Sequence, residues 1–267
     1  IVPGNIVLTA EPAGLTYLWN VGTPPYTTQV ITVDIAGLYG VTVTNAFGCT
    51  GFASVNLGTE LVIDGSFTNY NSALPAFTTE YVNKSQSFYN GVWNSGIMLE
   101  NTYAVDTSAW SNWPLLTFIG YHIYMHGKDH TNNTVGPRNF MMVNGSNSVI
   151  PLPTPHNRII WQQNFTVIPN RDYYFSAWAM NLTYGNCAQL RFEINGTQVG
   201  SIADLSTAPP VTSEAAINLS NWVRFYSTPL WTAPVGVTTA VVRIVNLNLA
   251  DGGNDFGLDD TSFGLLA

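Results

Sequence analysis

Charged residues are scarce in this chain. Asp, Glu, Lys and Arg make up 9% of its 267 residues, far below the roughly 25% of an ordinary soluble protein. Only 8 residues are Lys or Arg, against 16 Asp and Glu, which gives a net charge of −8. So few basic residues leave no stripe for a nucleic-acid backbone and no patch for anionic lipid, which excludes both as partners. The polar surface must come from Asn, Thr, Ser and Gln, as in extracellular β proteins and adhesins, or else a crowded assembly buries most of the surface.

The chain also lacks long apolar runs and has few cysteines. No run of about 18 apolar residues occurs, so no segment is predicted to insert into a membrane. Residue 1 is Ile, and we expect a processed start of a secreted, extracellular protein, with any export signal already absent. The 2 cysteines, Cys49 and Cys187, fit no metal-ligand spacing. A disulfide between them would link two distant parts of the chain, and the alternatives are unpaired thiols or a bridge between chains.

Helical periodicity is missing as well. Val, Thr, Tyr and Phe alternate with polar residues, and Gly, Pro, Asn and Asp interrupt the pattern every 8 to 12 residues or so. Residues Ile6–Ala10 and Leu38–Thr44 are typical of such strands. We therefore predict an all-β fold with two domains, at 1–58 and 60–267, because the chain is too long for one small sandwich. The short linker predicts a stiff pair.

The first unit carries a family resemblance in its strand and turn motifs. It contains Tyr17-Leu18-Trp19, the alternating strand Leu38–Thr44 and a Gly48-Cys49 turn. These motifs resemble the short Ig-like or PKD-like repeats of secreted Bacteroidetes proteins, which implies an Ig-like β-sandwich. In that family the corresponding cysteine commonly pairs with a cysteine just before the first strand. Residues 1–4 contain none, so the resemblance leaves Cys187 or another molecule as the partner of Cys49.

Acidic residues gather near the C-terminus, at Asp255, Asp259 and Asp260. In a regular strand Asp259 and Asp260 would point to opposite faces, so one could face the sandwich and the other solvent or a metal. A buried carboxylate needs a cation or several hydrogen-bond donors, and Ca²⁺ with mixed carboxylate and backbone oxygens would satisfy it. The alternative is that these are loop acids that cap turns.

The second unit resembles carbohydrate-binding-module jelly rolls of the family 4/9 and family 6 type. The resemblance rests on its opening strand Leu61–Phe67, its closing strand around Leu258–Phe263, and internal segments such as RNFMMVNGS and YYFSAWAMNL. It implies a jelly roll with a structural calcium where the first and last strands meet. Carried over, this nominates Asp64 and Asp259 as ligands, with Asp255 and Asp260 as neighbours, although Thr68 stands where the family has an acid.

The histidines and the nucleophiles give little sign of catalysis. His126 and His130 lie in a loop pattern without zinc spacing, so we expect a structural or hydrogen-bonded role, with Asp129 between them as a further calcium candidate. No nucleophile motif occurs. The glutamates stand in no recognisable frame for glycoside hydrolysis, which needs paired carboxylates. We expect no enzyme.

Aromatic residues are the best functional signal, because sugar rings stack on exposed aromatic faces. Trp and Tyr residues occur in an Asn- and Ser-rich insertion over residues 90–114 and in the loop at 183–186, and either group could form a stacking platform. The alternative is that those of the insertion plug the end of the sandwich or seat the first unit. The candidates for ligand binding are Trp93, Tyr103, Trp110, Trp113 and Tyr184. Four others alternate within strands and are predicted to be core: Trp161, Phe175, Trp178 and Phe192.

Together these features favour a non-catalytic, extracellular adhesive or carbohydrate-binding module of a bacterial surface protein, with a polysaccharide or cell-surface glycan as partner. One alternative is a structural subunit of a fibre that packs against copies of itself or neighbouring repeats. A second alternative is an accessory part of a secreted glycoside hydrolase.

Overall fold

The structure is a computed structural model, and its described part is built from β-strands. It describes residues 6–20, 25–33, 38–83, 88–89, 92–93, 100–107, 127–130, 139–145, 158–183, 186–208, 221–248, 250 and 253–266. Within these residues there is one turn of 3-10 helix, η2 (Leu205–Thr207), and no α-helix. The predicted all-β fold class is confirmed. No helix among the described residues is long and apolar enough to cross a membrane.

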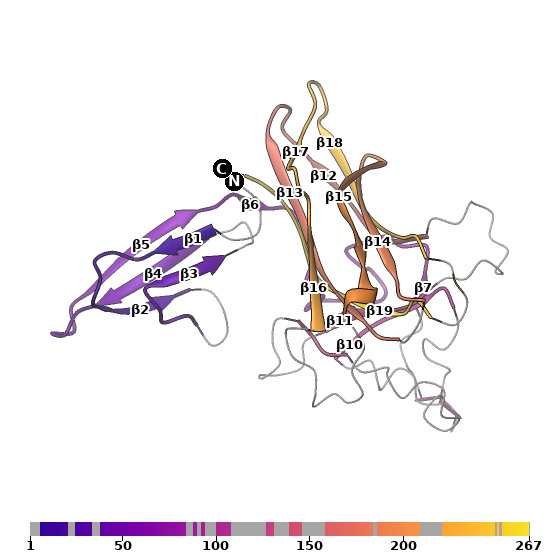
Figure 1. Ribbon diagram of the computed structural model, residues 1–267, viewed down its shortest axis with the longest axis horizontal. Helices are drawn as coiled ribbons and strands as arrows, with labels where there is room; N and C mark the ends of the chain where they lie inside the picture. The colour runs from indigo at the N-terminus through magenta and orange to yellow at the C-terminus, as the bar shows by residue number, and fades with distance from the viewer. Residues whose placement is uncertain are drawn as a thin grey trace.

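The first strands form a small sandwich of two antiparallel sheets, drawn in purple in Figure 1. One sheet pairs β1 (Ile6–Thr9) with β3 (Val30–Val33). The other has the order β2 (Thr16–Trp19), β4 (Leu38–Thr44) and β5 (Thr50–Asn56). Alternate apolar residues of these strands meet in one core that is separate from the core of the larger sandwich. The proposed boundary between residues 58 and 60 stays a prediction.

The larger sandwich packs an eight-stranded sheet against a four-stranded one. The eight-stranded sheet contains β6 (Thr59–Glu60), β7 (Val82–Asn83), β10 (Thr102–Asp106), β11 (Phe140–Asn144), β13 (Asp172–Asn181), β16 (Trp222–Tyr226), β17 (Trp231–Thr232) and β19 (Phe256–Leu265). The four-stranded sheet has the order β12 (Arg158–Thr166), β18 (Thr239–Asn246), β14 (Gln189–Ile194) and β15 (Thr197–Asp204). A separate hairpin pairs β8 (Phe88–Tyr89) with β9 (Val92–Trp93).

The core of the larger sandwich confirms most of the aromatic predictions. Trp161, Phe175 and Phe192 are buried between the sheets. The prediction for Trp178 is wrong, because Ala177 and its alternate neighbours on β13 face the core. Trp178 therefore lies half-buried on the outer face of the sheet, where strand alternation directs it.

The carboxylate of Glu60 bonds the segment that begins at Thr59 to the last strand, β19. Thr59–Glu60 pairs with Gly264 and Leu265 at the end of β19. The Glu60 carboxylate accepts hydrogen bonds from three backbone amides and two side-chain hydroxyls, which belong to Leu61, Val62, Phe263, Tyr174 and Ser262. The segment that follows the small sandwich is therefore held along β19.

Candidate functional site

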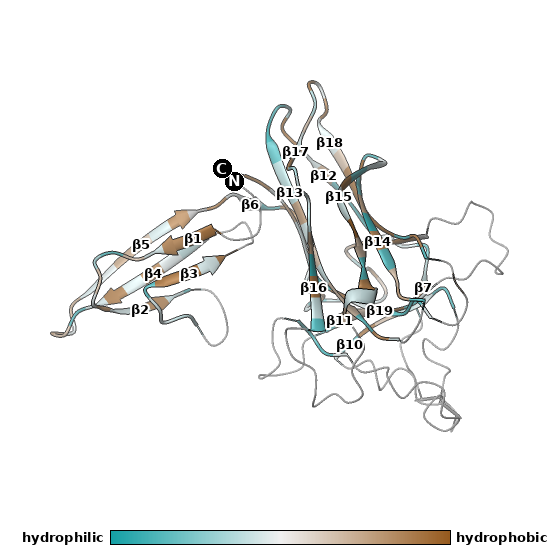
Figure 2. Cartoon of the chain, in the orientation of Figure 1, coloured by the Kyte–Doolittle hydropathy of each residue, from teal (hydrophilic) through white to brown (hydrophobic). Residues whose placement is uncertain are grey.

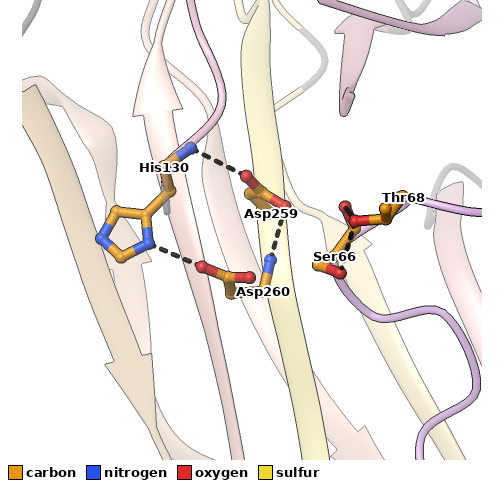
Figure 3. Close-up of polar contacts among 5 residues, drawn as sticks. All are labelled: Ser66, Thr68, His130, Asp259 and Asp260. Carbon is orange, nitrogen blue, oxygen red and sulfur yellow. Dashed lines mark hydrogen bonds and ion pairs between the residues drawn. The ribbon is translucent and has the colours of Figure 1, made fainter. Parts of the chain in front are cut away.

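A bulge in β19 brings two neighbouring carboxylates to the same loop. The pairing of β13 with β19 shifts register between Ser176 and Trp178, and Asp260 adopts a φ of 44°. The backbone amide of His130 donates to Asp259 Oδ2 at 2.8 Å, and His130 Nδ1 lies 2.7 Å from Asp260 Oδ2 (Figure 3). The expectation that these two carboxylates point to opposite faces is wrong, because a bulge re-aims a side chain.

His130 links this cluster to aromatic side chains on the outer face of the sheet. Its ring stacks on Trp178, with the ring centroids 4.0 Å apart, and meets Trp222 edge-on at 5.7 Å. The structure thus gives His130 the hydrogen-bonded, packed role that its loop position predicts.

The electrostatics of Asp259 favour a neutral or cation-bound carboxyl. Burial raises the pKa of Asp259 well above its usual range, and the charges of Asp260 and Asp129 raise it further. The backbone amides of His130 and Asp260 act in the opposite direction. Asp129 is itself 4% exposed and Asp259 0%. A shift of this origin favours the protonated form of the carboxyl, and a positive ion beside the carboxylate would favour the ionised form.

The donor chemistry of this cluster suits a hard cation, but its side chains alone do not form a metal site. Carboxylate oxygens are the ligands that Ca²⁺ prefers. Within the described ranges, however, no three Asp, Glu, His or Cys side chains are placed to hold a metal ion. A calcium bound by Asp129 and Asp259 would therefore take its remaining ligands from backbone oxygens or water.

The prediction of an opening strand at Leu61–Phe67 is wrong, because Asp64 and Phe67 adopt positive φ angles of 53° and 52° and the segment forms bends and turns. This segment contributes less to the site than the family resemblance implies. The carboxylate of Asp64 accepts a hydrogen bond from the Asn69 amide at 2.9 Å, within a turn. Thr68 pairs its hydroxyl with that of Ser66 at 3.1 Å, on the side of Asp259 and Asp260 away from His130 (Figure 3). The position where the family has an acid supplies no carboxylate here.

Asp255 is a further buried acid, near the half-buried Glu100. It is 3% exposed and accepts a hydrogen bond from the Gly145 amide at 3.1 Å. Burial raises its pKa well above the usual range, and the charge of Glu100 adds to the rise. Four residues along a strand separate Asp255 from Asp259, roughly 13 Å, so it is no direct neighbour of that carboxylate.

The residues predicted to stack on sugars fall into two groups. Tyr103 is 3% exposed within the core, and its hydroxyl lies 3.2 Å from that of Tyr70. Its prediction as an exposed ligand-binding residue is wrong, because β10 turns this ring into the sandwich. The side chain of Trp93 and the whole of Trp110, Trp113 and Tyr184 lie outside the described residues.

Both cysteines are free thiols in the structure. Cys49 is exposed in the small sandwich, and Cys187 is half-buried in the larger one. The side-chain amide of Asn181 donates to the Cys187 sulfur at 3.2 Å. The structure contains no bridge between Cys49 and Cys187, which leaves the thiols unpaired or available to another chain.

A groove that the sequence did not reveal runs between β15 and β16, the edge strands of opposite sheets. Its volume is about 550 Å³, and Tyr226, which is 40% exposed, forms part of its wall. The Arg224 guanidinium carbon lies 5.6 Å from the centre of the Tyr226 ring and 5.9 Å from that of Trp178. Polar and apolar side chains from both edges complete the lining, among them Ser201, Ile202, Asp204, Thr207 and Thr228.

The sequence signal for this groove is the alternation of β16. Trp222, Arg224 and Tyr226 share one face of the strand, and Val223 and Phe225 pack toward the core. That pattern places an arginine next to aromatic rings. It could not show which strand of the other sheet lies across from them.

Comparisons with known proteins report likenesses of fold. No family model matches the chain, and no curated protein matches it. One similar solved structure is described as a carbohydrate-binding module of the beta-sandwich superfamily, at 13% identity and a TM-score of 0.34, covering 98% of this chain and 92% of that one.

Two further structures show how varied these likenesses are. A CBM22-1 xylan-binding domain from Paenibacillus barcinonensis is 14% identical with a TM-score of 0.30, covering 51% of this chain and 78% of that one. A Stig cyclase from Fischerella sp. TAU is 10% identical with a TM-score of 0.43, covering 78% of this chain and 98% of that one. Likenesses this distant decide nothing about activity.

Proposed function

We propose that the chain is a non-catalytic carbohydrate-binding module of an extracellular adhesive protein, and that it binds polysaccharide in the β15–β16 groove. The observation that carries this proposal is the exposed Tyr226 ring in a mainly apolar groove that also presents charged and hydroxyl side chains. A sugar ring can lay its apolar face on the tyrosine while its hydroxyls bond to charged and hydroxyl side chains. Arg224 and Asp204 supply a donor and an acceptor for such hydroxyls.

The acids of the groove favour binding over hydrolysis. Glycosidases generally flank the scissile bond with two carboxylates about 5 to 10 Å apart. Asp204 is the one acid among the described residues that line this groove. Its carboxylate accepts hydrogen bonds from the Ser206 amide at 2.9 Å and the Gln189 side chain at 3.4 Å. Asp259 and Asp260 do not line this groove.

Tyr226→Ala is expected to weaken polysaccharide binding about tenfold, since aromatic contacts contribute about 0.5–1.5 kcal/mol beyond the area they bury. Affinity electrophoresis against a panel of neutral and acidic polysaccharides measures this. Tyr26→Ala is the matched control, because Tyr26 is also an exposed tyrosine, at 50%, and does not line the β15–β16 groove. A polysaccharide that binds the native chain and Tyr226→Ala equally would contradict the proposed site. No binding across the panel would contradict the function.

We also propose that the chain holds a structural calcium at Asp129 and Asp259, supported by their burial and by the chemistry of their oxygens. Thermal unfolding is expected to shift upward in CaCl₂ relative to EDTA. At a hundredfold excess over Kd the ion would add about 2.7 kcal/mol, or several degrees in Tm. Asp129→Asn should lose the shift, and Asp172→Asn, an exposed acid on β13, should keep it. Equal melting of the native chain in both buffers would contradict the proposal.

A further inference from the structure

The small sandwich is open along one side. On β5, Gly51, Ala53 and Val55 pair with inward-facing residues of β4, so they share the inner face of the sheet. The β4 partners Tyr39 and Val41 are buried, whereas these three residues of β5 are exposed. The opposite sheet therefore covers β4 but leaves the inner face of β5 uncovered.

The uncovered face forms an apolar groove beside β1. Its volume is about 530 Å³, and it is walled by β1, β4 and β5. In Figure 1 β1 lies between β4 and β5 in the view, and Figure 2 shows hydrophobic residues on β1 and β5. The lining includes Leu8, Trp19, Val43, Gly51, Ala53 and Val55.

The edge of β1 that borders this groove offers unpaired backbone groups. The Ala10 amide donates to the Gln29 carbonyl, on the β3 side. Because backbone groups alternate in direction along an antiparallel strand, those of Val7 and Thr9 point away from β3. Among the described residues, β3 is the one strand that pairs with β1. A polypeptide strand is the ligand whose backbone can satisfy such an edge.

The charge of this unit limits which strand would fit. Residues 1–58 contain no Lys, Arg or His, and their two acids are Glu11 and Asp34. Glu11 is the one charged residue that lines the groove. Glu11 follows β1, and the part of the lining that β5 contributes carries no charge, so a charge buried over β5 would have no partner there and an uncharged strand fits best.

We propose that this groove accepts an extended, uncharged strand of a partner polypeptide. The strand pairs with the free edge of β1 and lays alternate apolar side chains over Gly51, Ala53 and Val55. Gly51 and Ala53 leave room for large side chains opposite them, and the added strand completes the sheet above β5. Sheet completion of this kind joins successive protein molecules without the β15–β16 groove, so the proposal is independent of glycan binding.

A labelled peptide of alternating Val and Thr, with the 7-residue length of β5, serves as the probe. With the full chain, we expect it to bind and to slow hydrogen exchange of the Val7 and Thr9 amides at least tenfold. The same peptide N-methylated at alternate residues keeps its side chains but loses backbone pairing, and it should neither bind nor protect. Unchanged exchange at Val7 and Thr9, or equal binding of the methylated peptide, would overturn the proposal.

Two variants on β5 test the face. Ala53→Arg places a charge on the inner face and should weaken peptide binding at least tenfold, whereas Thr50→Arg lies on the outer face, outside the lining of the groove, and should leave binding unchanged. Both positions are exposed, so both variants should fold, as the thermal unfolding of the full chain will show. Equal binding by the two variants would place the peptide elsewhere and overturn the assignment.

Discussion

Phe263→Ala is expected to lower the free energy of unfolding of the larger sandwich by about 3–5 kcal/mol, the range for emptying a fully buried aromatic site. Phe263 is 0% exposed and lies near the middle of an aromatic cluster. Its ring centroid is 5.0 Å from that of Phe165 and 5.3 Å from that of Tyr173, with Trp231 at 6.3 Å. Urea unfolding followed by tryptophan fluorescence measures the loss.

Phe47→Ala is the matched control for this prediction. It makes the same chemical change at a hairpin of the small sandwich where the side chain is 91% exposed. Its effect should stay within about 0.5 kcal/mol. A loss at Phe263 as small as the loss at Phe47 would mean that the last strand does not close the core as described.

The sequence predicted strands well where the alternation of apolar and polar residues is regular. The predicted strand Leu38–Thr44 has the bounds of β4, and Ile6–Ala10 exceeds β1 by one residue. These segments have a strong period of two, and turn residues flank them. Strand identity is a local property, so a single sequence carries it.

Side-chain direction was predicted less well, because it depends on register. The shift between Ser176 and Trp178 lies in the β13–β19 ladder, and the positive φ of Asp260 lies next to it. The two together bring both Asp259 and Asp260 to His130, and no residue pattern announced them. The core prediction for Trp178 is wrong because β13 has aromatic residues on both faces, so its sequence does not indicate which face points to the core.

The candidate sites depend on contacts between distant parts of the chain. Asp129 and Asp259 are 130 residues apart, and β15 and β16 belong to different sheets. The order of strands within the sheets decides which edges face each other. For the calcium the family resemblance supplied Asp259 and the loop between His126 and His130 supplied Asp129, but neither supplied their proximity. For the β15–β16 groove no local signal was sufficient.

With divalent cations removed, the chain is expected to be more stable near pH 5 than near pH 8. Burial raises the pKa of Asp255, and that of Asp259, well above the usual range. A carboxyl whose pKa is raised on folding stabilises the folded state below its unfolded pKa of about 3.9, and this contribution is lost as pH rises through the folded pKa. The loss is about 1.4 kcal/mol for each pKa unit and each group. Urea unfolding in EDTA across this pH range measures it.

Asp255→Asn separates this contribution from the general effect of net charge. The amide can still accept the hydrogen bond from Gly145 but carries no charge, so the variant should be more stable than the native chain near pH 8 and less dependent on pH. Asp172→Asn, at an exposed position, should leave the pH dependence unchanged. The exposed Asp204 has a lowered pKa, so its contribution is lost only below this range. Destabilisation by Asp255→Asn near pH 8 would contradict the prediction, because it would mean that the ionised carboxylate is paired.

Calcium should oppose this trend. The ion binds the ionised carboxylate and competes with the proton for Asp259, so the stabilisation that it adds should grow from pH 5 to pH 8. In EDTA the buried Asp259 therefore makes the folded chain more stable at acid pH. In CaCl₂ the same buried carboxyl makes it more stable at neutral pH. For the native chain, the stability measured against pH should therefore slope in opposite directions in EDTA and in CaCl₂. For Asp129→Asn the two profiles should converge. That result would locate both the proton and the ion at this bulge in β19. Parallel profiles would leave the proton alone as the partner of the buried carboxyl.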